Sequence, residues 1–322
     1  MDTGSHLLMG ATLGGLAMVD PVVAAHHEAA YAVMAATLIG SHAPDFDTLA
    51  RLKGPAAYVR YHRGITHSLP APMLWALGLG FPIAMLTGAA DYVWTVVLWA
   101  FIAVCLHIVL DLCNGYGVQC LRPITRKWVH LDALCLFDPY LFGLHAAGAC
   151  LWLLRVLPPA PLFLTVYTLT ILYISWRLAA RRLIRRRLRL RFGLNGRLTM
   201  VPSLSGRSWQ FSAELDDRSV LGMISGRHIS IDHTVMKQAE QLPPAVAATM
   251  GADGVRAFLQ FAERVHYQVQ ERLDGYEVTW SDVRFWTKDG MPFGVAVQLD
   301  RNLQVLHHQL RWNKKTWEPP HV

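Results

Sequence analysis

The sequence predicts a membrane-embedded all-α helical bundle followed by a soluble α+β domain. Apolar residues make up 53% of the 322-residue chain and charged residues 16%, and the long apolar runs all lie before residue 179. Arginines crowd the segment after these runs, and the rest resembles an ordinary soluble domain. A chain of this length has room for about two domains. We divide it into a membrane-embedded domain (1–180), a basic juxtamembrane linker (181–194) and a cytoplasmic α+β domain (195–322).

Four apolar runs approach the roughly 20 residues that a helix needs to cross a bilayer. They cover about 70–87, 92–112, 136–157 and 161–178. Two weaker runs, 7–19 and 22–40, bring the expected number of helices to six. These two form either a tight hairpin that turns at Asp20-Pro21 or segments that lie partly in the membrane interface.

The distribution of basic residues predicts the orientation of the bundle. Loops 41–69 and 113–135 and the arginine segment are basic, whereas the connections between them have almost no Lys or Arg. Basic loops remain in the cytoplasm of bacterial inner-membrane proteins. We therefore expect an inner-membrane protein with both termini in the cytoplasm.

The net charge of +7 comes largely from eight arginines between Arg177 and Arg191. Because they directly follow an apolar helix, we expect them to contact membrane lipid, and anionic head groups in particular. We expect no nucleic-acid partner, and the partner of the C-terminal domain stays unknown. The five cysteines include no CxxC pair and resemble small buried hydrophobic residues.

Histidines and aspartates recur at the predicted cytoplasmic ends of the helices. His62 and His67 lie within a seven-residue motif that ends at Ser68, and His107 and Asp111 are one helical turn apart on one face. Residues of this kind are costly beside lipid and usually mark function. The candidate metal ligands are His6, Asp45, Asp47, His62, His67, His107 and Asp111, with Asp138 as a further candidate.

A histidine and aspartate set without cysteine favours Zn²⁺, or Mn²⁺, Fe²⁺ or Co²⁺. The number of candidates allows one ion or two, and in a two-metal site one carboxylate would bridge the pair. Among the candidates, we expect Asp47 and His67 to take part in catalysis. The planar fork of Arg63 would bind a phosphate or carboxylate oxygen, and Gly64 would allow a tight turn.

Each motif also has a structural interpretation. His62 and His67 could be hydrogen-bonded to loop carbonyls, and Asp45 and Asp47 could form a helix turn followed by an N-cap. His107 and Asp111 could be a buried pair that joins two helices. Their common position on one membrane face favours metal binding over these three separate explanations.

These motifs resemble the YdjM-like family of inner-membrane proteins, which is grouped with metal-dependent hydrolases. The resemblance covers about residues 1–180 and implies a membrane-embedded metal-dependent hydrolase without specifying its substrate. It rests on Ser5-His6, on Ser41–Asp47, on His62–Ser68, and on His107 and Asp111 followed by Tyr116-Gly117-Val118.

The C-terminal region alternates apolar and polar residues over 207–225 and 276–315, which predicts β-hairpins. A turn is expected at Asp300-Arg301-Asn302. Residues 255–273 are amphipathic at helical spacing and predict one helix. This region has no recognisable catalytic motif, so it would cap the site, bind a partner or select the substrate.

The sequence thus predicts a membrane hydrolase that acts on a lipid-borne or membrane-proximal ester or phosphoester. The alternative is a metal-binding scaffold or regulator without enzymatic activity, acting through its C-terminal domain. A transporter is less favoured, because transport sites normally lie near the bilayer midplane, whereas these candidates lie at one face.

Overall fold

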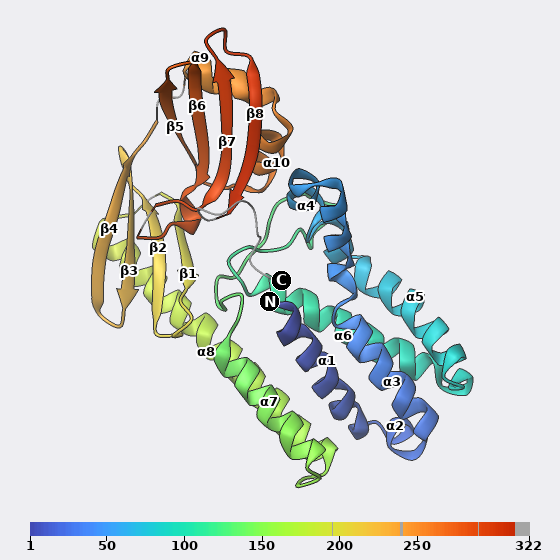
Figure 1. Cartoon of the computed structure of the whole chain (residues 1–322). Helices are drawn as coiled ribbons and strands as arrows, with labels where there is room; N and C mark the ends of the chain where they lie inside the picture. The colour runs from blue at the N-terminus through green and yellow to red at the C-terminus, as the bar shows by residue number, and fades with distance from the viewer. Residues whose placement is uncertain (195, 239–240, 289, 313–322) are drawn as a thin grey trace.

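A computed structural model describes residues 1–194, 196–238, 241–288 and 290–312. A helical bundle lies beside two four-stranded antiparallel sheets, and a long helix leads from the bundle to the first sheet (Figure 1). The predicted order of a helical region and then an α+β region is confirmed. The predicted basic linker 181–194 is largely helical, because the long helix continues to Phe192.

The bundle is formed by six helices of at least 14 residues and two shorter ones. Their bounds are α1 (Thr3–Leu16), α2 (Pro21–Ala25), α3 (His27–Gly40), α4 (Pro55–Tyr61), α5 (Ala71–Leu86), α6 (Val93–Leu112), α7 (Pro139–Leu153) and α8 (Pro159–Phe192). Short 3-10 segments connect several of them, including η2 (Ala43–Lys53), η3 (Ile65–His67) and η4 (Ala90–Tyr92).

Local sequence signals explain where several helices begin and end. The Asp20 carboxylate accepts a hydrogen bond from the backbone of Val22, and Pro21 occupies the first position of α2. This is the predicted turn between the two weaker apolar runs, which become α1 and α3. Helix α8 ends at Phe192 and is capped by Gly193, whose left-handed φ of 60° suits glycine.

Small residues allow the helices to approach one another closely. A Cβ atom on Gly10 of α1 would lie 2.2 Å from Ser41 Oγ and 2.8 Å from the carbonyl oxygen of Thr37. The largest buried cluster is built from alanine, valine and leucine side chains of α1, α3, α5, α6 and α8 together with Phe163. Close backbone contact therefore holds α1 and α6, the helices that carry His6 and His107, on either side of α3.

The expectation of four full membrane spans is not confirmed. Within the described residues, two helices are long and apolar enough to cross a membrane, Ala90–Leu112 and Pro159–Phe192. A third span results only if Pro55–His67 and Ala71–Leu86, which are bent by 80°, are counted together. Helices form where the other predicted spans lie, but α5 has 16 residues and α7 has 15, fewer than the roughly 20 that a straight crossing needs.

The C-terminal region contains two sheets with simple strand order. The first is β1 (Leu198–Pro202), β2 (Ser208–Glu214), β3 (Arg218–Ser225) and β4 (His228–Met236). The second is β5 (Val265–Arg272), β6 (Gly275–Asp282), β7 (Phe293–Asp300) and β8 (Val305–Trp312). Helices α9 (Pro244–Ala248) and α10 (Asp253–Phe261) precede the second sheet.

One prediction for this region is wrong in its second half. The single helix expected over 255–273 ends at Phe261, and Val265–Arg272 forms strand β5. Val265, Tyr267 and Val269 favour a strand, and antiparallel pairing with β6 decides the conformation. The hairpin over the predicted turn at Asp300–Asn302 is confirmed, since β7 and β8 pair across it.

The second sheet shares a hydrophobic core with the N-terminal region. Tyr58 and Val59 of α4 belong to the same buried cluster as Val255 and Phe258 of α10. At the edge of this contact, Arg60 Nη2 lies 2.6 Å from Asp253 Oδ1. Helix α4 is therefore held between the bundle and the C-terminal region.

Candidate metal centre

The candidate metal centre is a buried cluster at the end of the bundle that faces the two sheets. The start of α1 contributes His6, the end of α6 contributes His107 and Asp111, and the segment between α3 and α5 contributes the remaining residues. His67, His107, Asp45 and Asp111 are each at most 1% exposed. The structure thus brings together residues that are more than 100 positions apart in the sequence.

Four of these side chains form a compact group of donors. One ligand atom from each of Asp45, His67, His107 and Asp111 lies within 4.8 Å of the other three. The two Nε2 atoms of His67 and His107 are 3.2 Å apart. Asp45 Oδ1 is 3.6 Å from His67 Nε2 and 3.5 Å from His107 Nε2, and Asp111 Oδ2 is 3.6 and 3.7 Å from the same nitrogens.

These separations fit a tetrahedral cation site. Bonds of about 2.0–2.2 Å from Zn²⁺ to nitrogen and oxygen place the donors of a tetrahedron about 3.3–3.6 Å apart. The five separations run from 3.2 to 3.7 Å. Most of them are longer than a direct hydrogen bond, which is near 2.9 Å. The spacing of the four donors is therefore compatible with a cation between them.

A second group shares one residue with the first. Ligand atoms of Asp45, Asp47 and His62 also lie within 4.8 Å of one another. Asp45 therefore belongs to both groups, as the bridging carboxylate of a two-metal site would. Burial alone would raise the pKa of Asp45, but His107 and His67 hold that pKa well below its usual range, so the carboxylate stays ionised.

Unpartnered buried atoms provide an independent test of the fit. Both oxygens of Asp45 and Nε2 of His62 are buried without a hydrogen-bond partner. Leaving such groups unsatisfied costs about 1–3 kcal/mol each, and more when they are charged. All three atoms can act as ligands, so the residues present fit one or two divalent cations.

Neighbouring groups orient the ligands. His107 Nδ1 lies 2.7 Å from the carbonyl oxygen of Ser41, so Nδ1 is the donor and Nε2 is left as the acceptor. Asp47 Oδ1 lies 2.6 Å from His62 Nδ1, so Nδ1 is the donor and His62 Nε2 is left as the acceptor in the same manner. Thr66 Oγ1 contacts both Asp47 Oδ2 and His67 Nδ1.

The backbone turns sharply at Arg63, whose φ is 60°. Asp47 Oδ2 accepts a hydrogen bond of 2.9 Å from the Arg63 amide and stabilises this left-handed conformation. Gly64, the predicted turn residue, is needed for space, because a Cβ atom there would lie 2.8 Å from the Tyr61 carbonyl oxygen. The Asp47 carboxylate thus organises the whole histidine motif.

The Arg63 side chain is paired within the protein. Its Nε and Nη2 lie 3.0 and 3.1 Å from the two oxygens of Asp111, and Nη1 donates to Asn114 Oδ1 at 3.2 Å. Only 3% of the residue is exposed. This arrangement favours a role in positioning Asp111 over the predicted direct contact with substrate.

His6 and Asp138 have different positions from those expected. His6 lies outside both donor groups but is adjacent to them: its ring stacks on His107 at 3.8 Å, and its Nε2 is 3.3 Å from Asp111 Oδ1. Asp138 caps α7 by accepting from the amides of Tyr140 and Leu141. The structure does not bring Asp138 to the cluster, because helix capping uses its carboxylate.

Four supporting groups were missed by sequence reasoning. Asn114 accepts from Arg63 and from the amides of Tyr116 and Gly117. The Ser41 carbonyl and the Thr66 hydroxyl orient ligands, and the amino group of Met1 contacts Asp111 Oδ1. Asn114 could have been predicted as a supporting residue, since it follows Asp111 by three residues at the end of a helix. The role of a backbone carbonyl such as that of Ser41 cannot be predicted from the residue type.

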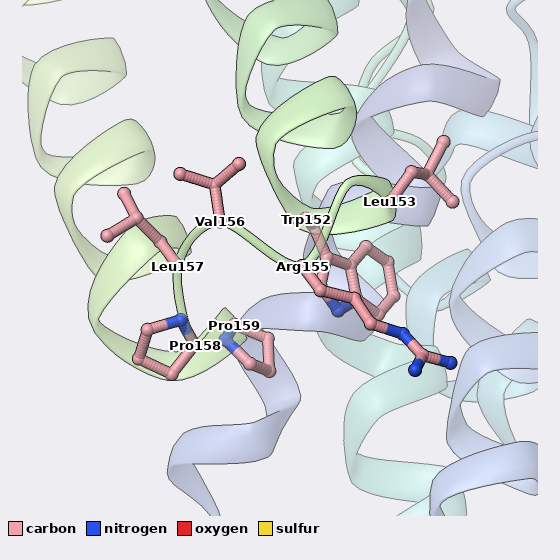
Figure 2. Close-up of a pocket in the computed structure, with 7 residues that line it drawn as sticks. All are labelled: Trp152, Leu153, Arg155, Val156, Leu157, Pro158 and Pro159. Carbon is pink, nitrogen blue, oxygen red and sulfur yellow. The ribbon is translucent and has the colours of Figure 1, made fainter.

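A cavity of about 490 Å³ lies at the opposite end of the bundle, in the turn between α7 and α8. Figure 2 shows that Trp152, Arg155 and Pro158–Pro159 line it, together with leucine and valine side chains. This lining is largely apolar and contains neither histidine nor carboxylate. It offers no chemistry for metal binding.

The fold and the cluster define a membrane protein with a buried histidine and aspartate site that could hold a metal ion. The chain belongs to the YdjM inner membrane protein family, whose sequence profile matches residues 1–184. The family resemblance predicted from the motifs is thereby confirmed. Residues 244–318 match a second profile, the YfhP C-terminal alpha/beta plait domain.

The chain is also similar over nearly its full length to an uncharacterised protein, YfhP, of Bacillus subtilis strain 168. The two are 34% identical over 315 residues, which cover 97% of this chain and 95% of the relative. No solved structure matches the chain significantly.

Proposed function

We propose that this chain is an integral membrane metal-dependent hydrolase with a two-metal centre. One observation carries the proposal: two donor groups share Asp45, whose carboxylate oxygens are both buried and without a hydrogen-bond partner. In a two-metal hydrolase, a shared carboxylate is expected to hold ions about 3.5–4 Å apart. Asp45, His67, His107 and Asp111 would hold one ion, and Asp45, Asp47 and His62 the other.

Divalent ions held there would polarise an ester or phosphoryl oxygen and activate water at neutral pH. The protein itself supplies orientation. Asp47 keeps His62 in one tautomer, and Arg63 and Asn114 fix the Asp111 carboxylate. Zn²⁺ suits these nitrogen and oxygen donors best, with Mn²⁺, Fe²⁺ or Co²⁺ as the other choices.

The position of the cluster favours a substrate that is part of the membrane or lies close to it. Asp111 is at the last turn of α6, one of the two helices long enough to span a bilayer. A centre at this depth receives a head group without extraction of the lipid from the bilayer. We propose a lipid-borne or membrane-proximal ester or phosphoester as substrate, approached from the cytoplasmic side.

The test uses the full chain purified in detergent and compares Asp45→Asn with Asp138→Asn. Both variants replace a carboxylate by an amide of the same shape, and both residues were candidate ligands from sequence alone. We expect Asp45→Asn to lose most of its bound metal, measured by plasma mass spectrometry, and Asp138→Asn to keep it. Asparagine caps helices about as well as aspartate, so α7 should survive in the control.

Turnover is then measured on a soluble phosphodiester, a soluble carboxylic ester and a phospholipid in mixed micelles. Loss of metal and turnover together in Asp45→Asn supports the hydrolase. Stoichiometric metal without turnover of any of these substrates would favour the alternative, a metal-dependent scaffold or regulator. Wild-type protein that holds no metal after purification and reloading would refute both.

A further inference from the structure

A second cavity, of about 520 Å³, lies between α8, the first sheet and the start of β5. Five arginines line it: Arg181, Arg185 and Arg189 from α8, Arg197 before β1, and Arg264 before β5. Cavities of roughly 300–1,000 Å³ accommodate small-molecule ligands. This cavity is therefore large enough for more than a single ion.

The carboxylates around the cavity are already paired with other cations. Asp132 pairs with Arg181 and with His130, Glu263 pairs with His130 and with Arg284, and Glu214 pairs with Lys237. In the part of the chain that the structure describes, no ion pair involves the four remaining cavity arginines, Arg185, Arg189, Arg197 and Arg264. The cavity thus has an excess of positive charge that its own carboxylates do not neutralise.

Arg264 gives the clearest sign that a counter-ion belongs here. Only 9% of it is exposed. Its Nη1 donates to the carbonyl and hydroxyl oxygens of Ser212, both at 3.0 Å, whereas its Nη2 is buried and without a hydrogen-bond partner. A buried guanidinium without an ion-pair partner is unfavourable. An anion in the cavity would satisfy this guanidinium.

The arginines of α8 are spaced for one ligand. Arg181, Arg185 and Arg189 follow one another at four-residue intervals and so share a face of the helix. Like charges at this spacing repel one another and destabilise a helix. Guanidinium groups match the oxygens of phosphate with paired hydrogen bonds. A phosphate-bearing ligand would remove the repulsion and use this geometry.

We propose that this cavity binds a ligand carrying a pyrophosphate or two neighbouring phosphate groups. Arg185, Arg189, Arg197 and Arg264 are its donors. Arg177 is the first arginine after the apolar part of α8. Arg185 lies eight residues further, or about 12 Å along the helix. At this distance from the apolar part, the phosphate groups can belong either to a soluble compound or to a lipid head group. The site is separate from the candidate metal centre, and the proposal holds whether or not that centre is hydrolytic.

The experiment is a calorimetric titration of the full chain in detergent with sodium pyrophosphate. EDTA is present so that phosphate cannot bind through metal at the other site. We expect binding that weakens about ten- to a hundredfold in Arg185→Gln, as expected for the loss of a charge-assisted hydrogen bond. Arg186→Gln is the matched control, because Arg186 is exposed on the same helix and lies outside the cavity. Its affinity should equal that of the wild type.

A second arm identifies the source of the ligand. Thermal unfolding is measured in phosphatidylcholine nanodiscs with and without a lipid pyrophosphate. Stabilisation by this lipid that disappears in Arg185→Gln but not in Arg186→Gln assigns the site to a head group. Binding of soluble pyrophosphate alone assigns it to a soluble ligand. The proposal is overturned if neither probe binds, or if both variants weaken binding equally. Arg264→Gln serves as a second cavity variant if Arg185→Gln does not fold.

Discussion

The charged network around His130 predicts that the protein loses stability at alkaline pH. His130 Nδ1 is hydrogen-bonded to Asp132, and its Nε2 lies 3.2 Å from Glu263 Oε1. Arg181 faces Asp132 on the other side, and Arg284 faces Glu263. Burial alone would lower the pKa of His130, but the two carboxylates outweigh burial and raise this pKa to about 9.

The size of the effect follows from the difference between the folded and unfolded pKa values. An unfolded histidine has a pKa of about 6.5, and each unit of difference corresponds to about 1.4 kcal/mol, so the upper bound is about 3.4 kcal/mol. The His130 side chain is 16% exposed, and allowing for solvent screening we expect about 2–3 kcal/mol. Because the folded pKa is the higher one, this stability is fully present below about pH 6.5 and is lost as the pH rises through about 9.

The assay is thermal unfolding of the full chain, followed by tryptophan fluorescence between about pH 6 and pH 9.5. Hydrogen exchange over residues 113–138 reports the same loss locally. We expect the wild-type melting temperature to fall across this range and His130→Gln to be less stable at pH 6 with a flatter profile. His266→Gln is the control, because His266 of β5 lies outside the network.

Two results would refute this reasoning. One is a His130→Gln profile as steep as that of the wild type, which would place the titrating group elsewhere. The other is a wild-type melting temperature that rises with pH over the same range, which would reverse the sign of the linkage.

Three further predictions concern the bundle and the candidate metal centre. Gly10→Ala should destabilise the protein by about 1–3 kcal/mol through overpacking. Gly78→Ala should not, because a Cβ atom there has no neighbour within 4 Å. Chemical denaturation compares the two variants, and equal losses of stability would contradict the packing argument. Arg177→Gln should lower the free energy of unfolding by about 2–4 kcal/mol, because the buried guanidinium donates to two backbone carbonyls. This variant should therefore melt at a lower temperature, whereas Arg182→Gln, at an exposed position, should leave the melting temperature unchanged. Zn²⁺ is added to EDTA-stripped protein at a hundred times its dissociation constant. The ion should stabilise the wild type by about 2.7 kcal/mol and Asp45→Asn by much less. Equal stabilisation of both proteins would exclude Asp45 as a ligand.

Much of the candidate site could be predicted because its donors lie in short local motifs. His107 and Asp111 share a helical face by their spacing, and Asp47 and His62 lie in a loop too polar for the membrane interior. The sequence did not distinguish a ligand from a helix cap at Asp138. The proline that follows Asp138 is typical of a helix start, and it would have favoured capping.

The parts that could not be predicted depend on contacts between distant segments. Residues 265–272 fit the pattern of an amphipathic helix as well as that of a strand, and pairing with β6 decides that they form a strand. Arg63 is paired with Asp111, which lies 48 residues away in the sequence. The local sequence is therefore the same whether Arg63 binds a substrate anion or is buried and positions Asp111. The arginines from Arg177 to Arg191 were expected to contact lipid, but Arg177 is 0% exposed and its guanidinium lies 4.2 Å from the centre of the Trp209 ring.

The position of α4 would couple an ion at the second donor group to the docking of the C-terminal region. His62 follows the last turn of this helix, and its ring stacks on Tyr58 at 4.7 Å, while Tyr58 is part of the core that includes α10. A displacement of α10 would shift one ligand of the second donor group and leave the first group in place. By thermodynamic reciprocity, an ion bound at the second group would strengthen the docking of the C-terminal region by the same factor by which docking would strengthen ion binding.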